Sequence, residues 1–229
     1  MQDKIVAIDF SGTFIKVEVA EEANKFRAKV LGRSLPTKEE HARSKELYKI
    51  NNEFVEKLTG LKKDAKVNYV TNKKERIFLR GEEIQTQIAT NLFQIGMYMV
   101  AKEKRLDIFP DGLVEALKYL KSKKYKIAIV SGIRSDIISG MFEISGIKIK
   151  PDYILGQNPI LSFSNKNLLD ELKEKGTVVA VLGDKYSDLE PAKELDAKAI
   201  FVKGGHPSGN EEEIADFVLE SWKDINKYL

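Results

Sequence analysis

Near its start the chain reads Lys4-Ile5-Val6-Ala7-Ile8, and this apolar run leads directly into Asp9-Phe10-Ser11-Gly12-Thr13. Three further runs of the same kind follow: Lys126-Ile127-Ala128-Ile129-Val130, Val178-Val179-Ala180-Val181-Leu182 and Ala199-Ile200-Phe201-Val202. All four are rich in β-branched residues, lack alternation with polar residues, and are bounded by Gly, Asp or Ser. Strands buried on both faces have this composition, so the runs predict a parallel sheet covered by helices.

Helical periodicity precedes two of these strands. Residues 110–123 place Leu113, Leu117 and Leu120 on one helical face, and residues 166–175 bring Leu168, Leu169 and Leu172 together. Helix followed by strand, repeated along the chain, is the α/β pattern. We therefore expect a Rossmann-like α/β core with a parallel sheet.

The segment between the first two strands is too long for one crossover. Residues 14–31 alternate loosely around Glu21-Glu22-Ala23-Asn24, which predicts a β-hairpin. Thr37 and Glu40 have capping-box spacing at the start of a helix that runs to about Leu58, and a second helical pattern covers residues 81–104. We therefore expect a core made of residues 1–34 and 107–229, and a helical insert at residues 35–106.

Composition excludes several classes of protein. The 229 residues are 42% hydrophobic and 32% charged, which is typical of a globular protein rather than a disordered one. The absence of cysteine excludes disulfides and thiolate chemistry, and two histidines are too few for a histidine-rich metal centre. The net charge of +3 is too small to favour nucleic-acid binding.

No apolar run reaches the ~20 residues of a membrane helix, and no signal peptide is visible, so we expect a cytoplasmic protein without a membrane partner.

Polar residues follow three of the four strands. Asp9 follows Ile8, Ser131-Gly132 follows Val130, and Asp184 comes one glycine after Leu182. Open α/β sheets place their sites at the carboxyl ends of the strands, so we expect these side chains to converge. Asp184 and Asp188, four residues apart across a strand-to-helix loop, predict a site for a hard cation such as Mg²⁺.

In this order the motifs resemble those of the haloacid dehalogenase-like superfamily of phosphohydrolases. The resemblance covers residues 4–16 and about 107–204, and it implies that the hairpin at residues 14–31 is a flap and that residues 35–106 form a helical cap, as in the phosphoserine phosphatase branch. The family's third motif is a lysine, for which Lys166 is our choice, with Lys173 and Lys185 as alternatives.

The resemblance also implies a mechanism for a small phosphorylated substrate. Asp9 would attack phosphorus and form an aspartyl-phosphate, which water then hydrolyses. Mg²⁺ would be held by Asp9, the Ser11 backbone carbonyl, Asp184 and Asp188. The transferring oxygens would be bound by Ser131, Gly132 and Lys166.

Ser11 departs from the family pattern. Most phosphatases of the superfamily carry a second aspartate there as general acid and base, whereas P-type ATPases have threonine, phosphonoacetaldehyde hydrolases have alanine and haloacid dehalogenases have tyrosine. A serine hydroxyl is too weak an acid for this role, and its loss typically costs ~10²–10⁴-fold in rate.

Three functions remain open. The first is a phosphatase of reduced activity, favouring aryl or acyl phosphates, or passing its phosphoryl group to another acceptor. The second is a binding or regulatory protein that recognises phosphate without turnover. In the third, closure of the cap brings in the missing acid, for which the candidates are Glu18, Glu21, Glu22 and His41. The sequence leaves the substrate and the oligomeric state open.

Overall fold

A computed structural model describes residues 2–35, 44–70, 76–156, 165–205 and 207–229. The chain divides into two compact units. The first contains residues 1–20 and 98–229, and the second contains residues 21–97. In the described part of the chain, every helix is too short or too polar to cross a bilayer.

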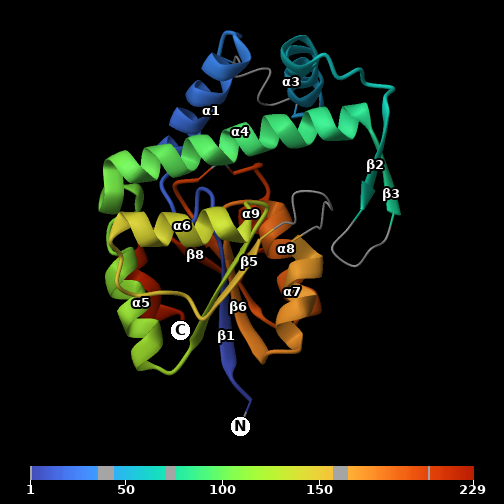
Figure 1. The fold of residues 1–229 in the computed structure, drawn as a ribbon. Coiled ribbons are helices and arrows are strands. Elements are labelled where there is room, and N and C mark those ends of the chain that lie inside the picture. The colour runs from blue at the N-terminus through green and yellow to red at the C-terminus, as the bar shows by residue number, and fades with distance from the viewer. Residues whose placement is uncertain (1, 36–43, 71–75, 157–164, 206) are drawn as a thin grey trace. The chain divides into compact units, whose positions relative to one another are not determined.

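The first unit is built on a six-stranded sheet in which all neighbouring strands are parallel. The order is β5-β4-β1-β6-β7-β8, which places the N-terminal strand inside the sheet (Figure 1). The four predicted strands are β1 (Lys4–Asp9), β4 (Lys126–Ser131), β6 (Thr177–Gly183) and β7 (Lys198–Val202). The predicted α/β class is therefore confirmed. Two short strands that the sequence analysis did not predict, β5 (Tyr153–Gly156) and β8 (Phe217–Leu219), lie at the two edges.

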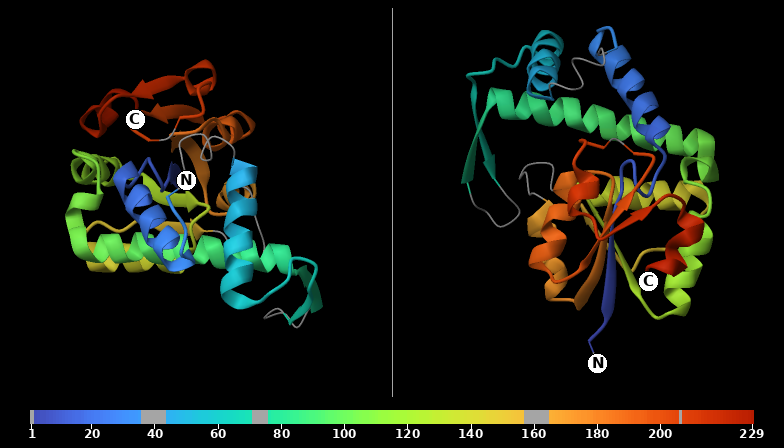
Figure 2. Two further views of the ribbon diagram at one scale, coloured as in Figure 1. Left: turned by 90° about the horizontal axis from the view of Figure 1, so that it is seen from above. Right: turned by 180° about the vertical axis from the view of Figure 1, so that it is seen from behind.

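Helices cover the sheet on both faces (Figures 1 and 2). Helices α7 (Asn165–Lys173) and α8 (Tyr186–Glu194) lie on one side, and α5 (Leu113–Ser122) lies on the other. The leucines that predicted α7 pack with Leu189 and Ala192 of α8 against buried side chains of β1, β4 and β6. The first unit also contains α6 (Ser135–Ser145), α9 (Glu211–Ile214) and the 3₁₀ helices η1 (Arg105–Ile108) and η2 (Trp222–Lys227).

The turn after β1 is fixed by an aromatic cluster. Phe10 and Phe14 are fully buried and contact Phe142 of α6, with ring centroids 6.4 and 5.3 Å from the Phe142 ring. Phe109 packs edge-on against Phe14. Within the turn, the Gly12 N–H donates to the Ile15 carbonyl over 3.1 Å, and Gly12 adopts a φ of +89°, which favours glycine. The residues that follow the Asp9 carboxylate therefore have a defined backbone.

The second unit contains α3 (Ser44–Thr59), the hairpin strands β2 (Lys66–Val70) and β3 (Arg76–Arg80), and most of two long helices. These helices are α1 (Val17–Leu31) and α4 (Gly81–Lys104). The N-terminal end of α1 and the C-terminal end of α4 belong to the first unit. Leu31, Val55 and Ala89, one from each helix, form its buried cluster. The helix predicted at residues 81–104 is confirmed, whereas Thr37, Glu40 and the predicted start of α3 lie outside the described residues.

The β-hairpin predicted at residues 14–31 is wrong, because most of this segment is helix α1. Its buried residues include Val19, Ala23 and Leu31, which follow a helical spacing, while Val30 is 39% exposed. Alanine and glutamate favour a helix, and burial along one helical face outweighs the short alternation that suggested strands. The hairpin of this chain lies instead at β2 and β3, in a segment that we expected to be helical or connecting.

Candidate active site

The register of the sheet brings the ends of three strands together. Asp9 is the last residue of β1 and lies opposite Val130, next to Ser131 at the end of β4. On the other side, Ile8 lies opposite Leu182 of β6, so the Gly183-Asp184 step follows beside Asp9. The pairing of these strands thus places the polar residues that follow them at one edge of the sheet.

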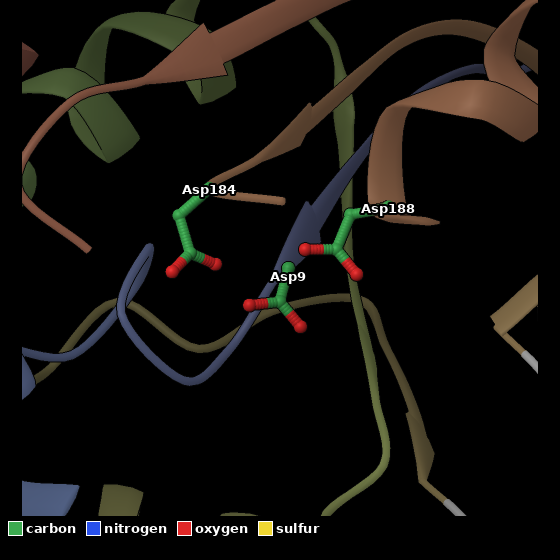
Figure 3. A group of neighbouring side chains, drawn as sticks. All are labelled: Asp9, Asp184 and Asp188. Carbon is green, nitrogen blue, oxygen red and sulfur yellow. The ribbon is translucent and has the colours of Figure 1, made fainter. Parts of the chain in front are cut away.

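Three carboxyl groups meet at this edge (Figure 3). Asp9, Asp184 and Asp188 each offer an oxygen, and these three atoms all lie within 4.8 Å of one another. Asp184 is fully buried, and Asp188 is buried in the first turn of α8. Burial, followed by the negative charges of Asp188 and Asp184, raises the pKa of Asp9 well above its usual value, although the Lys185 ammonium and the Phe10 N–H act in the opposite direction. Such a cluster is electrostatically costly until a cation compensates it.

The donor set suits a magnesium ion. Mg²⁺ takes oxygen ligands at about 2.1 Å, so two opposite ligands lie roughly 4.2 Å apart. Three carboxylate oxygens within 4.8 Å of one another are close enough for one such ion to be shared among them. The described residues therefore provide three anionic ligands for a hard cation, with Asp9 among them.

Three glycines and a threonine fix the carboxylates. The buried Thr13 hydroxyl donates to Asp184 Oδ1 over 3.3 Å. A Cβ atom on Gly12 or Gly205 would collide with Asp184, and a Cβ atom on Gly183 would collide with Asp188. The backbone at these three positions therefore approaches the carboxylates more closely than any other residue type allows.

Of the three predicted phosphate-binding residues, Ser131 and Gly132 lie at the same end of the sheet as Asp9, and Lys166 is only partly described. Ser131 is buried, and its Oγ accepts from the Ile133 N–H over 3.2 Å, so the hydroxyl still carries its own hydrogen to donate. Gly132 follows it and is partly exposed. Lys166 is the second residue of α7, and its side chain lies outside the described part of the structure.

The two alternative lysines differ. Lys173 lies in the last turn of α7 and pairs with Asp170 over 2.7 Å at an exposed position. Lys185 directly follows Asp184, occupies the N-cap position of α8, and acts electrostatically on Asp9. The structure thus puts the positive charge of Lys185 near the carboxylates.

The four candidate general acids differ in where they lie. Glu18, Glu21 and Glu22 belong to helix α1, with Glu18 and Glu21 exposed, rather than to a hairpin flap. His41 lies outside the described residues. Ser11 is partly buried in the turn after β1.

Sequence reasoning assigned no role to Thr13, Gly205 or Glu211, which contact the carboxylates or the loops around them. Thr13 stands inside the first motif, and Gly204-Gly205 comes one residue after a core strand, so the sequence pattern marks both positions. Glu211 gave no such signal, because it is one of three consecutive glutamates that read as a solvated surface.

Comparison with known proteins adds three findings. A family model described as haloacid dehalogenase-like hydrolase matches residues 4–196. A soluble P-type ATPase-like phosphatase from Methanocaldococcus jannaschii is 28% identical over 111 residues, which are 48% of this chain and 39% of that protein. The chain therefore matches about two fifths of the length of this relative.

Solved structures resemble the chain over nearly its whole length. A predicted phosphoglycolate phosphatase from Haemophilus somnus has a TM-score of 0.66 at 16% identity, covering 99% of this chain and 98% of the other. A haloacid dehalogenase-like family hydrolase from Streptococcus pneumoniae has a TM-score of 0.65 at 15% identity, with coverages of 99% and 98%. At these identities the likeness shows the fold alone.

Proposed function

Because the chain belongs to the family of haloacid dehalogenase-like hydrolases, we propose that it is a Mg²⁺-dependent phosphatase that acts on a small phosphorylated molecule through Asp9. The observation that carries this proposal is the convergence of Asp9, Asp184 and Asp188 at the carboxyl edge of a parallel sheet. The phosphatase name of the Methanocaldococcus jannaschii relative supports the same reaction class.

Asp9 is the proposed nucleophile. Its carboxylate attacks phosphorus in line, the bond from phosphorus to the leaving oxygen breaks, and the resulting aspartyl-phosphate is hydrolysed by water. A bound Mg²⁺ supplies the positive charge that lets an anionic nucleophile approach an anionic phosphate. Asp184 and Asp188 would hold this ion together with Asp9 and the backbone carbonyl of Ser11.

The transferring phosphoryl oxygens need hydrogen-bond donors. Ser131, the last residue of β4, supplies a buried hydroxyl, and Gly132, which follows it, supplies a backbone amide; β4 is the strand that pairs with β1 next to Asp9. Lys166, at the start of α7, is the proposed lysine of the third motif. Donors held in place before the reaction stabilise the charge that develops on the phosphoryl oxygens.

Ser11 sets the expected level of activity. The position carries no carboxylic acid, so a departing alkoxide receives no proton from it. We propose that the enzyme favours aryl or acyl phosphates, whose leaving groups depart without protonation, or passes its phosphoryl group to another acceptor. We further propose that residues 35–106 act as a helical cap that selects the substrate, as in the phosphoserine phosphatase branch.

The test is Mg²⁺-dependent hydrolysis of p-nitrophenyl phosphate, whose leaving group needs no general acid. We expect wild-type turnover that a chelator abolishes and that Asp9→Asn lowers by about 10³-fold or more, because the nucleophile is lost. Asp3→Asn is the matched control, since Asp3 is exposed at the opposite end of β1. Binding of phosphate without turnover in the wild type would instead support a regulatory protein.

A further inference from the structure

The loop that follows β7 lies against Asp184. Within residues 203–210, of which residue 206 lies outside the described part, Gly204 and Gly209 adopt φ angles of +109° and +114°. Gly205 lies so close to Asp184 that any side chain there would collide with it, and the Gly205 Cα lies 3.3 Å from the position of a Cβ on Gly12. The loop therefore forms one wall of the space that Asp184 occupies.

A buried carboxylate holds this loop. Glu211, the first residue of α9, is 2% exposed. Its Oε1 accepts from the Ser208 hydroxyl over 2.6 Å and also from the Ser208 N–H, and its Oε2 accepts from the Gly209 N–H over 2.8 Å. Two oxygens thus bind three donors of the loop that precedes them.

The same carboxylate also reaches the helix that carries Asp188. Glu211 Oε1 accepts from the Tyr186 N–H over 3.2 Å. Tyr186 is the first residue of α8, and Asp188 lies in the first turn of that helix. One side chain therefore joins the loop against Asp184 to the start of the helix that presents Asp188.

We propose that Glu211 is a positioning residue for the metal site, which fixes Asp184 and Asp188 by clamping the loop after β7 to the N-terminus of α8. This inference rests on the proposed function, because it requires that the three aspartates bind Mg²⁺. Groups that orient metal ligands without touching the metal typically contribute 10–100-fold to metal affinity or activity.

The test measures metal binding directly on the purified chain without substrate. Mn²⁺ binding is followed by electron paramagnetic resonance, and Mg²⁺ is titrated as a competitor. We expect Glu211→Gln to raise the dissociation constants for both ions by about 10-fold, because an amide cannot accept from all of these donors. Glu213→Gln is the matched control, since Glu213 is an exposed glutamate in the same short helix, and it should leave both constants within about twofold.

A second pair of variants covers the case in which Glu211→Gln does not fold. Ser208→Ala removes the hydroxyl donor and should weaken Mg²⁺ binding by roughly threefold, while Ser208→Thr retains a hydroxyl and should restore most of it. In turnover assays we expect the Mg²⁺ requirement to rise in Glu211→Gln, whereas KM for p-nitrophenyl phosphate at saturating Mg²⁺ stays unchanged.

The outcomes separate the two proposals. If the wild type binds neither ion, the proposed function and this inference both fail. If the wild type binds them and a folded Glu211→Gln, or Ser208→Ala where that is the folded variant, binds equally tightly, Glu211 does not position the site and the proposed function stands.

Discussion

Ser11 lies two residues beyond the Asp9 carboxylate, in a turn that the Phe10 and Phe14 side chains anchor. Its hydroxyl has no acidity to offer a leaving alkoxide near neutral pH. Replacing it by Asp would add an acid to a backbone that already has a defined shape. We expect Ser11→Asp to raise kcat for alkyl phosphates by about 10²-fold and to change p-nitrophenyl phosphate hydrolysis little.

Ser11→Asn is the control for this prediction, because asparagine has nearly the same shape as aspartate but no acidic proton to donate. Steady-state measurement of kcat for alkyl phosphates and for p-nitrophenyl phosphate, in the wild type and both variants, tests the prediction. An equal gain in Ser11→Asn, or no gain in Ser11→Asp, would show that the missing acid does not limit the rate.

Glu211 also determines how stability responds to acid. Burial by itself would raise the pKa of Glu211, but hydrogen bonds from the Ser208 hydroxyl and from the Ser208 and Gly209 amides outweigh it and lower the pKa to about 2. A carboxyl group whose pKa is lower in the folded state stabilises the fold above its unfolded pKa, 4.5, and loses this effect as the pH falls towards 2.

We therefore expect the melting temperature of the wild type to exceed that of Glu211→Gln at pH 6 and this gap to narrow between pH 4.5 and 2. Calorimetry across this range would measure it, with Glu213→Gln as the reference. A gap that does not change with pH would contradict the prediction.

At the scale of elements, the crossing of α1 and α4 depends on a glycine. A Cβ atom on Gly96 of α4 would lie 3.0 Å from both the Cα and the carbonyl oxygen of Ala23 in α1. We expect Gly96→Leu to destabilise the protein by about 1–3 kcal/mol through overpacking, despite the better helix propensity of leucine.

Thermal unfolding followed by circular dichroism checks this prediction. Ile95→Leu, at the neighbouring position where the side chain is 45% exposed, should shift stability by less than about 0.5 kcal/mol. A Gly96→Leu variant as stable as the wild type would mean that the two helices separate without cost.

The same elements show what the sequence could predict. The buried runs of β1, β4, β6 and β7 carry their signal in consecutive residues, because a central parallel strand is apolar on both faces. The outer strands β5 and β8 are only four and three residues long and partly exposed, so this signal is missing from them. In α1, the spacing of Val17 and Val19 resembles that of a strand, whereas the alanines and glutamates of the segment and its burial along one helical face favour the helix.

Some residues of the candidate site could be predicted from the sequence, and others required the structure. Asp9, Ser131 and Asp184 were visible because each follows a strand that is itself visible. Glu211 lies 23 residues beyond Asp188 in the sequence, and its contact with the Tyr186 N–H depends on how the loop after β7 folds back. No local pattern records such a contact, so it required the structure.

At the scale of the whole molecule, metal binding should couple to stability. An ion that binds only the folded chain stabilises it by about 2.7 kcal/mol at 100 times its dissociation constant. For a chain of this length that corresponds to a rise of roughly 5–11 °C in the melting temperature. We expect Mg²⁺ to produce this rise in the wild type and not in Asp184→Asn, which loses one of the three carboxylates.

Differential scanning fluorimetry with and without Mg²⁺ would measure this shift. Sodium chloride at the same ionic strength controls for screening of the net charge of +3. An equal rise in Asp184→Asn would place the ion elsewhere on the protein.

The position of β1 inside the sheet has a consequence for how the chain is made. Ile8 pairs with Ile129 on one side and with Leu182 on the other, so the first strand has one neighbour that is synthesised about 170 residues later. At ~5–20 residues per second, a ribosome needs roughly 9–35 s to supply it. The unit formed by residues 21–97 is contiguous in sequence and can fold within that interval. During the same interval β1 has no β6 to pair with. A nascent chain that leaves the ribosome before β6 is synthesised therefore contains Asp9 but neither Asp184 nor Asp188. Such a truncated chain cannot form the cluster of three carboxylates.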